Sequence, residues 1–185
     1  GGLFAWSAIV SNKALVNIET SVQNQSATPS TAVVTAYMTD REGKIVARAK
    51  DQPLSIAVNR PVTAINNISL VNFRNWTLDD PYLYRVVVEV RVNGKIIDQQ
   101  KIRYGLRQIE IKPNGVFLNG QHVKLFGVNN HQDHAGLGSA LPDYLQYYRI
   151  SLLKRMGVNA YRTSHNAPTA ELLDACDSLG MLVMD

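Results

Sequence analysis

The chain has 185 residues, 45% of them hydrophobic and 18% charged, which is enough to bury a sizeable core. Its net charge is +4, but the nineteen Lys and Arg are scattered along the chain, so the sequence argues against a nucleic-acid partner. The single cysteine, Cys176, excludes an internal disulfide and a multi-cysteine metal site.

No apolar run approaches the length of a membrane span, so no membrane partner is expected. The first residues lack the pattern of a secretion signal, and the missing initiator Met suggests a processed or excised piece. The compartment therefore stays open between periplasmic or secreted and cytoplasmic.

Residues 13–110 are predicted to form an immunoglobulin-like β-sandwich. Apolar and polar residues alternate in several short runs, most clearly from Tyr84 to Val92, and Asn93-Gly94 follows as a hairpin turn. Several short strands at such spacing are typical of a sandwich. Trp76 falls within this range, and core packing is expected for it.

Residues 111–185 show a different pattern, in which apolar strands alternate with helical segments. After a predicted ribbon around Val116–Leu118, the expected elements are a strand at 124–128, a helix at about 142–156, a strand at 158–163, a helix at 169–179 and a strand from 181. Such alternation predicts parallel βα units. A (β/α)₈ barrel needs eight strands and ~250 residues, so the expected fold is mainly β plus α/β, a sandwich followed by the first units of a truncated barrel.

The two helices have predictable ends and buried faces. Asp143 is a candidate N-cap, and Gly157 and Gly180 stand where a helix would end. The residues expected on the buried faces are Leu145, Tyr148, Leu152, Leu153 and Met156 in the first helix and Leu172, Leu173, Cys176 and Leu179 in the second.

Polar clusters follow the first two strands of this region. Asn129, His131, Asp133 and His134 end the first, and Arg162, Ser164, His165 and Asn166 end the second. Because ligands bind at the carboxyl ends of parallel strands, these side chains are expected to share one rim. His131, Asp133 and His134 are all possible zinc ligands, but their i, i+2, i+3 spacing matches no usual metal motif, and no metal site is assigned.

Three motifs in order resemble glycoside hydrolase family 2, closest to its β-galactosidase branch. They are Phe126-Gly-Val-Asn-Asn-His-Gln-Asp-His134, Asn159-Ala-Tyr-Arg-Thr-Ser-His165 and Leu173-Asp-Ala-Cys-Asp-Ser-Leu-Gly-Met-Leu-Val-Met-Asp185. The upstream sandwich is similar to the family's immunoglobulin-like domain, and residues 1–12 to the tail of its preceding sugar-binding domain. The expected domains are therefore residues 1–12, 13–110 and 111–185.

The resemblance implies a retaining exo-β-glycosidase acting on terminal β-linked sugars of an oligosaccharide or glycan. Two glutamates would act as acid/base and nucleophile, about 5–5.5 Å apart. In the family both lie on later barrel strands, so no catalytic residue is assigned here and this chain alone is expected to be inactive. No cofactor is assigned to it, although a divalent or monovalent cation and homo-oligomerisation are compatible with the full-length enzyme.

The resemblance also implies roles for individual residues. His131 and His165 would hydrogen-bond sugar hydroxyls and stabilise the transition state, and Arg162 would lie near the nucleophile. Asn129 would organise its loop through side-chain-to-backbone hydrogen bonds, and Asp133 is a further candidate. Gln132 and Asn166 stand where many members have Glu and Tyr, which leaves the sugar open.

The alternatives are a β-glucuronidase or β-mannosidase of the same family, a non-catalytic carbohydrate-binding or interaction module, and a purely structural domain. Exposed aromatic residues on the sandwich surface would favour the binding module.

Overall fold

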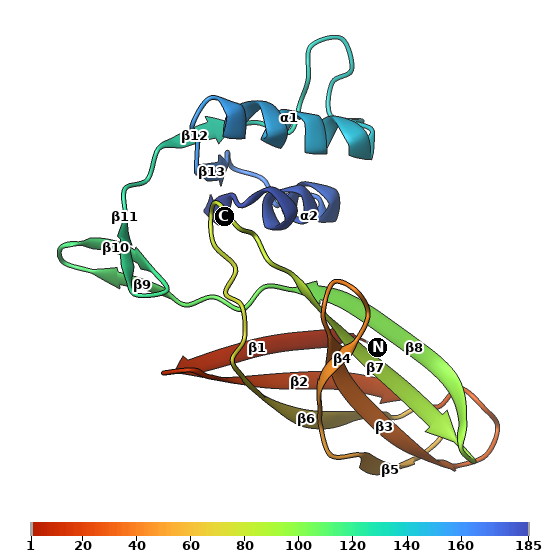
Figure 1. The fold of residues 1–185 in the computed structure, drawn as a ribbon. Helices are drawn as coiled ribbons and strands as arrows, with labels where there is room; N and C mark the ends of the chain where they lie inside the picture. Colours follow the sequence, from red (N-terminus) through yellow and green to blue (C-terminus); the bar gives the residue numbers. More distant parts are fainter. Residues whose placement is uncertain (1, 185) are drawn as a thin grey trace. The chain divides into compact units, whose positions relative to one another are not determined.

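The computed structural model describes residues 2–184, which divide into two compact units (Figure 1). The first unit runs to Arg74 and resumes from Leu83 to Leu106. The second comprises Asn75–Tyr82 and the chain from Arg107 onward. Within the described residues, no helix is long and apolar enough to cross a membrane.

The first unit is an antiparallel β-sandwich, as predicted. One sheet has the order β1-β2-β6, and the other has the order β4-β3-β7-β8 with β5 also paired to β3. The strands are β1 (Leu3–Val10), β2 (Lys13–Gln23), β3 (Ser30–Thr39), β4 (Ile45–Arg48), β5 (Gln52–Ile56), β6 (Pro61–Val71), β7 (Tyr84–Val92) and β8 (Lys95–Tyr104).

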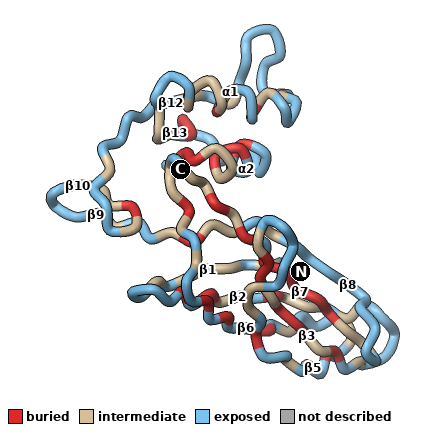
Figure 2. Tube along the Cα trace, viewed as in Figure 1, coloured by how far each residue is buried: buried red, intermediate tan, exposed pale blue. Residues whose placement is uncertain are grey.

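Alternation along the strands forms the core of the sandwich. On β2, Ala14, Val16 and Ile18 are buried while their neighbours are exposed or half-buried. Strand β7 is buried at six of its nine positions, and Figure 2 shows buried residues continuing along β3 and β7. Burial on both faces is typical of a central strand, although Arg85, Glu89 and Arg91 are charged.

The beginning of the chain differs from the prediction. Residues 1–12 were expected to be the tail of a preceding domain, but β1 pairs with β2 from Leu3 to Val10 and lies within the first unit. The cause is a tight turn at Ser11, whose φ of 55° reverses the chain directly into β2. Position 1 lies outside the described residues.

The second unit contains a ribbon, a parallel sheet and two helices. The ribbon has the order β11-β10-β9, and the parallel sheet has the order β12-β13-β14. The elements are β9 (Ile109–Lys112), β10 (Gly115–Leu118), β11 (Gln121–Val123), β12 (Gly127–Asn130), α1 (Asp143–Arg155), β13 (Ala160–Thr163), α2 (Ala170–Leu179) and β14 (Leu182–Met184).

Trp76 is fully buried, but in the second unit rather than in the sandwich. Its indole nitrogen donates to the carbonyl of Asp177 at 2.7 Å, and the guanidinium of Arg107 lies 4.7 Å from the ring centroid. Lys154 then joins the same segment to the end of α2, donating to the carbonyls of Leu78 at 3.0 Å and Gly180 at 2.9 Å. Residues 75–82, which interrupt the sandwich sequence, are therefore a support for α2.

The helices begin and end close to the predicted residues, but their buried faces differ from the prediction. Thr169 caps α2 by accepting from the amide of Leu172, whereas α1 begins after Pro142 without a side-chain cap. In α1 the buried residues are Gln146 and Ile150, while Tyr148 and Met156, expected inside, are exposed. In α2, Leu172 and Cys176 are buried as predicted, and Leu173 is 39% exposed.

Gly157 and Gly180 both have left-handed backbones, with φ of 85° and 74°, but only Gly180 is crowded. A Cβ atom there would lie 2.1 Å from the carbonyl oxygen of Leu78, whereas one on Gly157 would meet nothing within 4 Å. We expect Gly157→Ala to cost about 1 kcal/mol for the left-handed backbone alone. Gly180→Ala should cost clearly more, because a backbone atom must also move.

Urea denaturation of the two variants checks this difference. Equal losses of unfolding free energy at the two glycines would contradict the close approach of Leu78 to α2.

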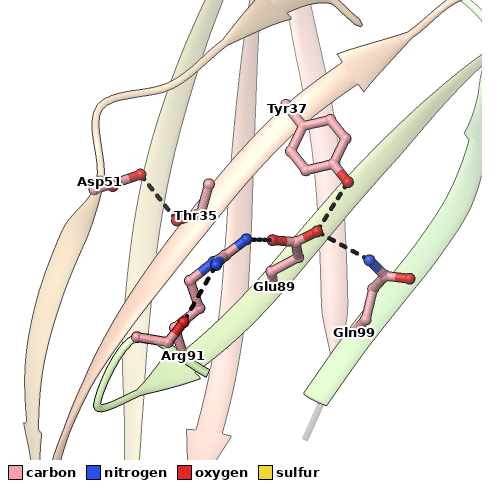
Figure 3. Close-up of polar contacts among 7 residues, drawn as sticks. Thr35, Tyr37, Asp51, Glu89, Arg91 and Gln99 are labelled. Carbon is pink, nitrogen blue, oxygen red and sulfur yellow. Dashed lines mark hydrogen bonds and ion pairs between the residues drawn. The ribbon is translucent and has the colours of Figure 1, made fainter. Parts of the chain in front are cut away.

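The outer face of the larger sandwich sheet holds a buried carboxylate, Glu89 (Figure 3). Glu89 accepts from Tyr37 at 2.9 Å, from Gln99 at 3.0 Å and from Arg91 at 2.6 Å. Burial alone would raise the pKa of this carboxyl, but the three donors outweigh burial and hold it below its usual value. Beside this cluster, Thr35 donates to Asp51 at 2.9 Å.

Because the pKa of Glu89 is lowered on folding, its stabilising contribution is complete above the unfolded value and is lost as the pH falls through the folded value. We expect Glu89→Gln to lower the free energy of unfolding by about 1–2 kcal/mol at pH 7, since charge-assisted hydrogen bonds are lost. The deficit should shrink as the pH falls through the lowered folded pKa, because the native carboxylate then becomes protonated.

Thermal unfolding between pH 3 and 8 measures the effect, with exposed Glu19 changed to Gln as the matched control. A pH-independent deficit at position 89 would contradict this account.

Candidate active site

The candidate site is carried by three short parallel strands. Asn129 of β12 lies opposite Arg162 of β13, and Arg162 lies opposite Met184 of β14. Asn159 fixes the start of this pairing: its side-chain oxygen accepts from the amide of Phe126 at 2.8 Å, and its side-chain nitrogen donates to the carbonyl of Lys124 at 2.9 Å. The polar residues that follow the strands therefore emerge on one edge of the sheet.

The two faces of the sheet differ sharply. On one face, Val128, Tyr161 and Val183 join the apolar core formed with α1 and α2. The alternate positions, including Asn129 and Arg162, line a cavity of about 510 Å³. Its walls also include apolar residues of the ribbon, of the core-facing strand positions and of α2, such as Ile109, Val128 and Cys176. The polar side chains of β12 and β13 therefore share this cavity with part of the apolar core.

Two histidines meet where the strands end. The rings of His131 and His165 lie 6.0 Å apart between centroids at an interplanar angle of 74°, so that one ring presents its edge to the other. Both residues are exposed. The loops that carry them are joined by the backbone, since the amide of Ser164 donates to the carbonyl of Asn130 at 3.0 Å.

The backbone at His165 is unusual, with a φ of 64°. Left-handed conformations are uncommon for residues other than glycine, and when they persist they tend to occur at functional sites. Ser164 just before it is buried. The backbone at His165 is thus held in a costly conformation by its surroundings.

Side chains outside the predicted set hold the loop after β12. Arg149 of α1 donates to the carbonyls of His131 at 2.8 Å and Asp133 at 2.6 Å. Gln132 donates to the carbonyl of Ala167, joining this loop to the one after β13. Arg149 and Gln132 thus supply side-chain-to-backbone hydrogen bonds that hold this loop. Asn129 lines the cavity, and the organising role expected of it stays a prediction.

The remaining predicted residues lie in the loops. Asp133 is exposed, with its backbone held by Arg149. His134 contacts the carbonyl of Ala135 through Nδ1 at 2.9 Å and pairs with Gly138 in a short turn. Asn166 donates to the carbonyl of Ser164 at 3.4 Å.

Two ionisable side chains beneath the sheet, Cys176 and Tyr161, are buried, and burial favours their uncharged forms. Burial raises the pKa of the Cys176 thiol to about 12, so the reactive thiolate is disfavoured. Burial also raises the pKa of Tyr161, and the nearby Arg149 only partly opposes it. Among residues 2–184, no group of three or more His, Cys, Asp or Glu side chains could hold a metal ion.

The second unit thus carries histidines and an arginine at the carboxyl edge of a parallel sheet, and the first unit is a β-sandwich. The family model "Glycosyl hydrolases family 2" matches residues 4–107, and "Glycosyl hydrolases family 2, TIM barrel domain" matches residues 109–185. The chain therefore belongs to glycosyl hydrolases family 2.

Similar proteins carry two different activity names. β-Galactosidase BoGH2A of Bacteroides ovatus is 33% identical over 180 residues, which cover 97% of this chain and 21% of that protein. A β-glucuronidase of Formosa agariphila is 29% identical over 99% of this chain and 19% of its own length. The chain thus spans about a fifth of the length of these relatives.

Solved structures agree with the fold. The crystal structure of a family 2 member from Bacteroides cellulosilyticus has a TM-score of 0.93 at 34% identity, covering 100% of this chain and 26% of that one. A β-glucuronidase of family 2 also has a TM-score of 0.93, at 26% identity, over 99% of this chain and 20% of its own.

The left-handed backbone at His165 gives a test of strain. We expect His165→Gly to be more stable than His165→Ala by about 1 kcal/mol, because only glycine adopts this φ freely. At His131, whose φ is not positive, the order should reverse by about 0.5 kcal/mol, because glycine gains more freedom in the unfolded chain.

Denaturation of the four variants measures both differences. Alanine matching or exceeding glycine at position 165 would show that the site stores no strain there.

Proposed function

We propose that this chain supplies part of the active-site rim of a retaining exo-β-glycosidase that hydrolyses terminal β-linked sugars, with a β-galactosidase favoured. The observation that carries the proposal is the pair His131 and His165, 6.0 Å apart at the carboxyl edge of a parallel sheet. Two relatives named as β-galactosidases, from Bacteroides ovatus and Thermoanaerobacter pseudethanolicus, support this branch.

The chemistry of the rim suits a sugar ring. Each imidazole offers one donor and one acceptor on a rigid ring, which matches hydroxyl groups that do both. Hydroxyl contacts that strengthen as the oxocarbenium-like transition state forms would contribute directly to rate. Arg162, one strand position from the edge and beside Asn129, would keep a neighbouring nucleophilic carboxylate ionised.

The rim of this chain would not hydrolyse a glycoside alone. A retaining mechanism uses two carboxyl groups about 5–5.5 Å apart on either side of the glycosidic carbon. The rim segments 129–134 and 162–168 contain a single carboxylate, Asp133. The two glutamates would therefore come from later barrel strands of a longer polypeptide. Binding of a divalent or monovalent cation by that longer polypeptide stays a prediction.

A second candidate, a carbohydrate-binding module, is favoured by one observation. Phe4 and Trp6, 64% and 40% exposed, stack with centroids 5.4 Å apart on the surface of β1. Aromatic side chains in such positions offer an apolar surface to a partner.

The choice is tested with p-nitrophenyl β-galactoside, β-glucuronide and β-mannoside, using this chain and a longer polypeptide that carries it together with the rest of the barrel. We expect the longer polypeptide to prefer the β-galactoside and the chain alone to be silent. Replacing His131 or His165 by Ala in the longer polypeptide should lower kcat/KM by about 10²–10³-fold, as for other lost transition-state hydrogen bonds.

Hydrolysis by the chain alone would contradict the placement of the two glutamates. Silence of both polypeptides, together with quenching of Trp6 fluorescence by an oligosaccharide, would favour the binding module. Because the other tryptophan, Trp76, is fully buried, the exposed Trp6 would report such contact.

A further inference from the structure

Arg149 makes contacts that its position on a helix does not require. Its guanidinium donates through one terminal nitrogen to the carbonyl of His131 at 2.8 Å and through the other to that of Asp133 at 2.6 Å. Arg149 also lies close enough to Tyr161, which is buried beneath the sheet, to oppose part of the rise in the pKa of that residue. One side chain therefore joins α1 to the loop that carries His131.

These contacts constrain the loop at two points two residues apart. With the carbonyls of His131 and Asp133 fixed on one planar group, the peptide planes that follow these two residues have little freedom to rotate. Gln132 itself is tied to the carbonyl of Ala167, in the loop that follows His165. The backbone under both histidines is thus cross-linked, and Arg149 supplies the part that comes from outside the loops.

The fold of α1 does not depend on Arg149. The helix is anchored by Ile150 and Gln146, which are buried, and by Leu153, which packs against the core of the second unit. Arg149 is only half-buried, between this anchored face and the loop. Both of its hydrogen bonds are directed at the loop, as expected of a residue that sets loop geometry.

We propose that Arg149 is a positioning residue that holds the His131 loop so that the His131 ring meets His165 at the rim. The proposal rests on the proposed glycosidase function for its catalytic consequence, but the positioning can be measured without activity. Arginine is required rather than any cation, because its planar fork reaches two carbonyls at once whereas a lysine ammonium is a point charge.

The first experiment uses the 185-residue chain and its two rim histidines. In NMR spectra, native protein should show a cross-relaxation signal between the ring protons of His131 and His165. Arg149→Gln should abolish that signal and broaden the amide resonances from His131 to His134, and Arg149→Lys should restore it in part. Arg155→Gln, an exposed arginine one and a half turns further along α1, is the matched control and should leave the signal unchanged.

The second experiment places the same variants in the longer polypeptide. Misplacing a binding group by about 1 Å can cost ~10²-fold, so Arg149→Gln should lower kcat by 10- to 100-fold with a smaller change in KM. Arg149→Lys should recover part of that loss. A purely structural residue would instead lower the melting temperature and the active fraction, and leave kcat per folded molecule unchanged.

An unchanged ring-to-ring signal in Arg149→Gln would overturn the proposal, and so would a kcat per folded molecule equal to that of the native enzyme. If no version of the longer polypeptide hydrolyses a glycoside, the proposed function fails, while the NMR comparison still decides whether Arg149 positions the loop.

Discussion

The parallel pairing of β12 with β13 is the constraint on which the site depends. It sets Asn129 opposite Arg162 and brings the ends of both strands to the same edge of the sheet, where the loops of His131 and His165 begin. Two strands of four residues each have few hydrogen bonds of their own. Asn159, which bonds to the backbone on both sides of Leu125, fixes the register before the ladder starts. A slip of one residue would exchange the two faces of the strand and turn Arg162 toward the apolar core.

Support for this small sheet comes from a distant part of the sequence. Trp76 and Leu78 lie between two strands of the sandwich in sequence, yet they pack and bond against α2 and the residue after it. Asn119 adds a further link by donating to the carbonyl of Trp76 at 3.0 Å. The helix that covers the sheet is thus held from outside by a segment that closes over it. This arrangement places the end of α2, and hence the start of β14, without any contribution from the rim.

Sequence patterns predicted those parts of the fold that depend on local periodicity. Alternation located β2 and β7, and glycines at positions 157 and 180 marked the helix ends. The same patterns did not predict the buried face of a helix that carries apolar residues on all its sides. In α1 several stripes are equally apolar, so Tyr148 was expected inside although Gln146 and Ile150 occupy the buried face.

The site was predictable only in part for a related reason. The position of polar residues at strand ends predicted that His131 and His165 would meet, because parallel topology alone requires it. The role of Arg149 had no such signal. Its partners are backbone carbonyls, which every residue carries, so no pattern of side chains could mark them. Likewise, the size of Trp76 predicts burial but not which of the two units receives it.

In the second unit, the interactions that hold the structure differ between the core and the rim, and this difference leaves the rim open to a ligand. Apolar packing is concentrated between the sheet and the helices, whereas the rim is exposed and kept in shape by hydrogen bonds to backbone. Hydrogen bonds fix direction as well as distance, so a few of them can hold a loop whose side chains remain exposed. The left-handed backbone at His165 costs stability. The apolar packing between the sheet and the helices can offset that cost.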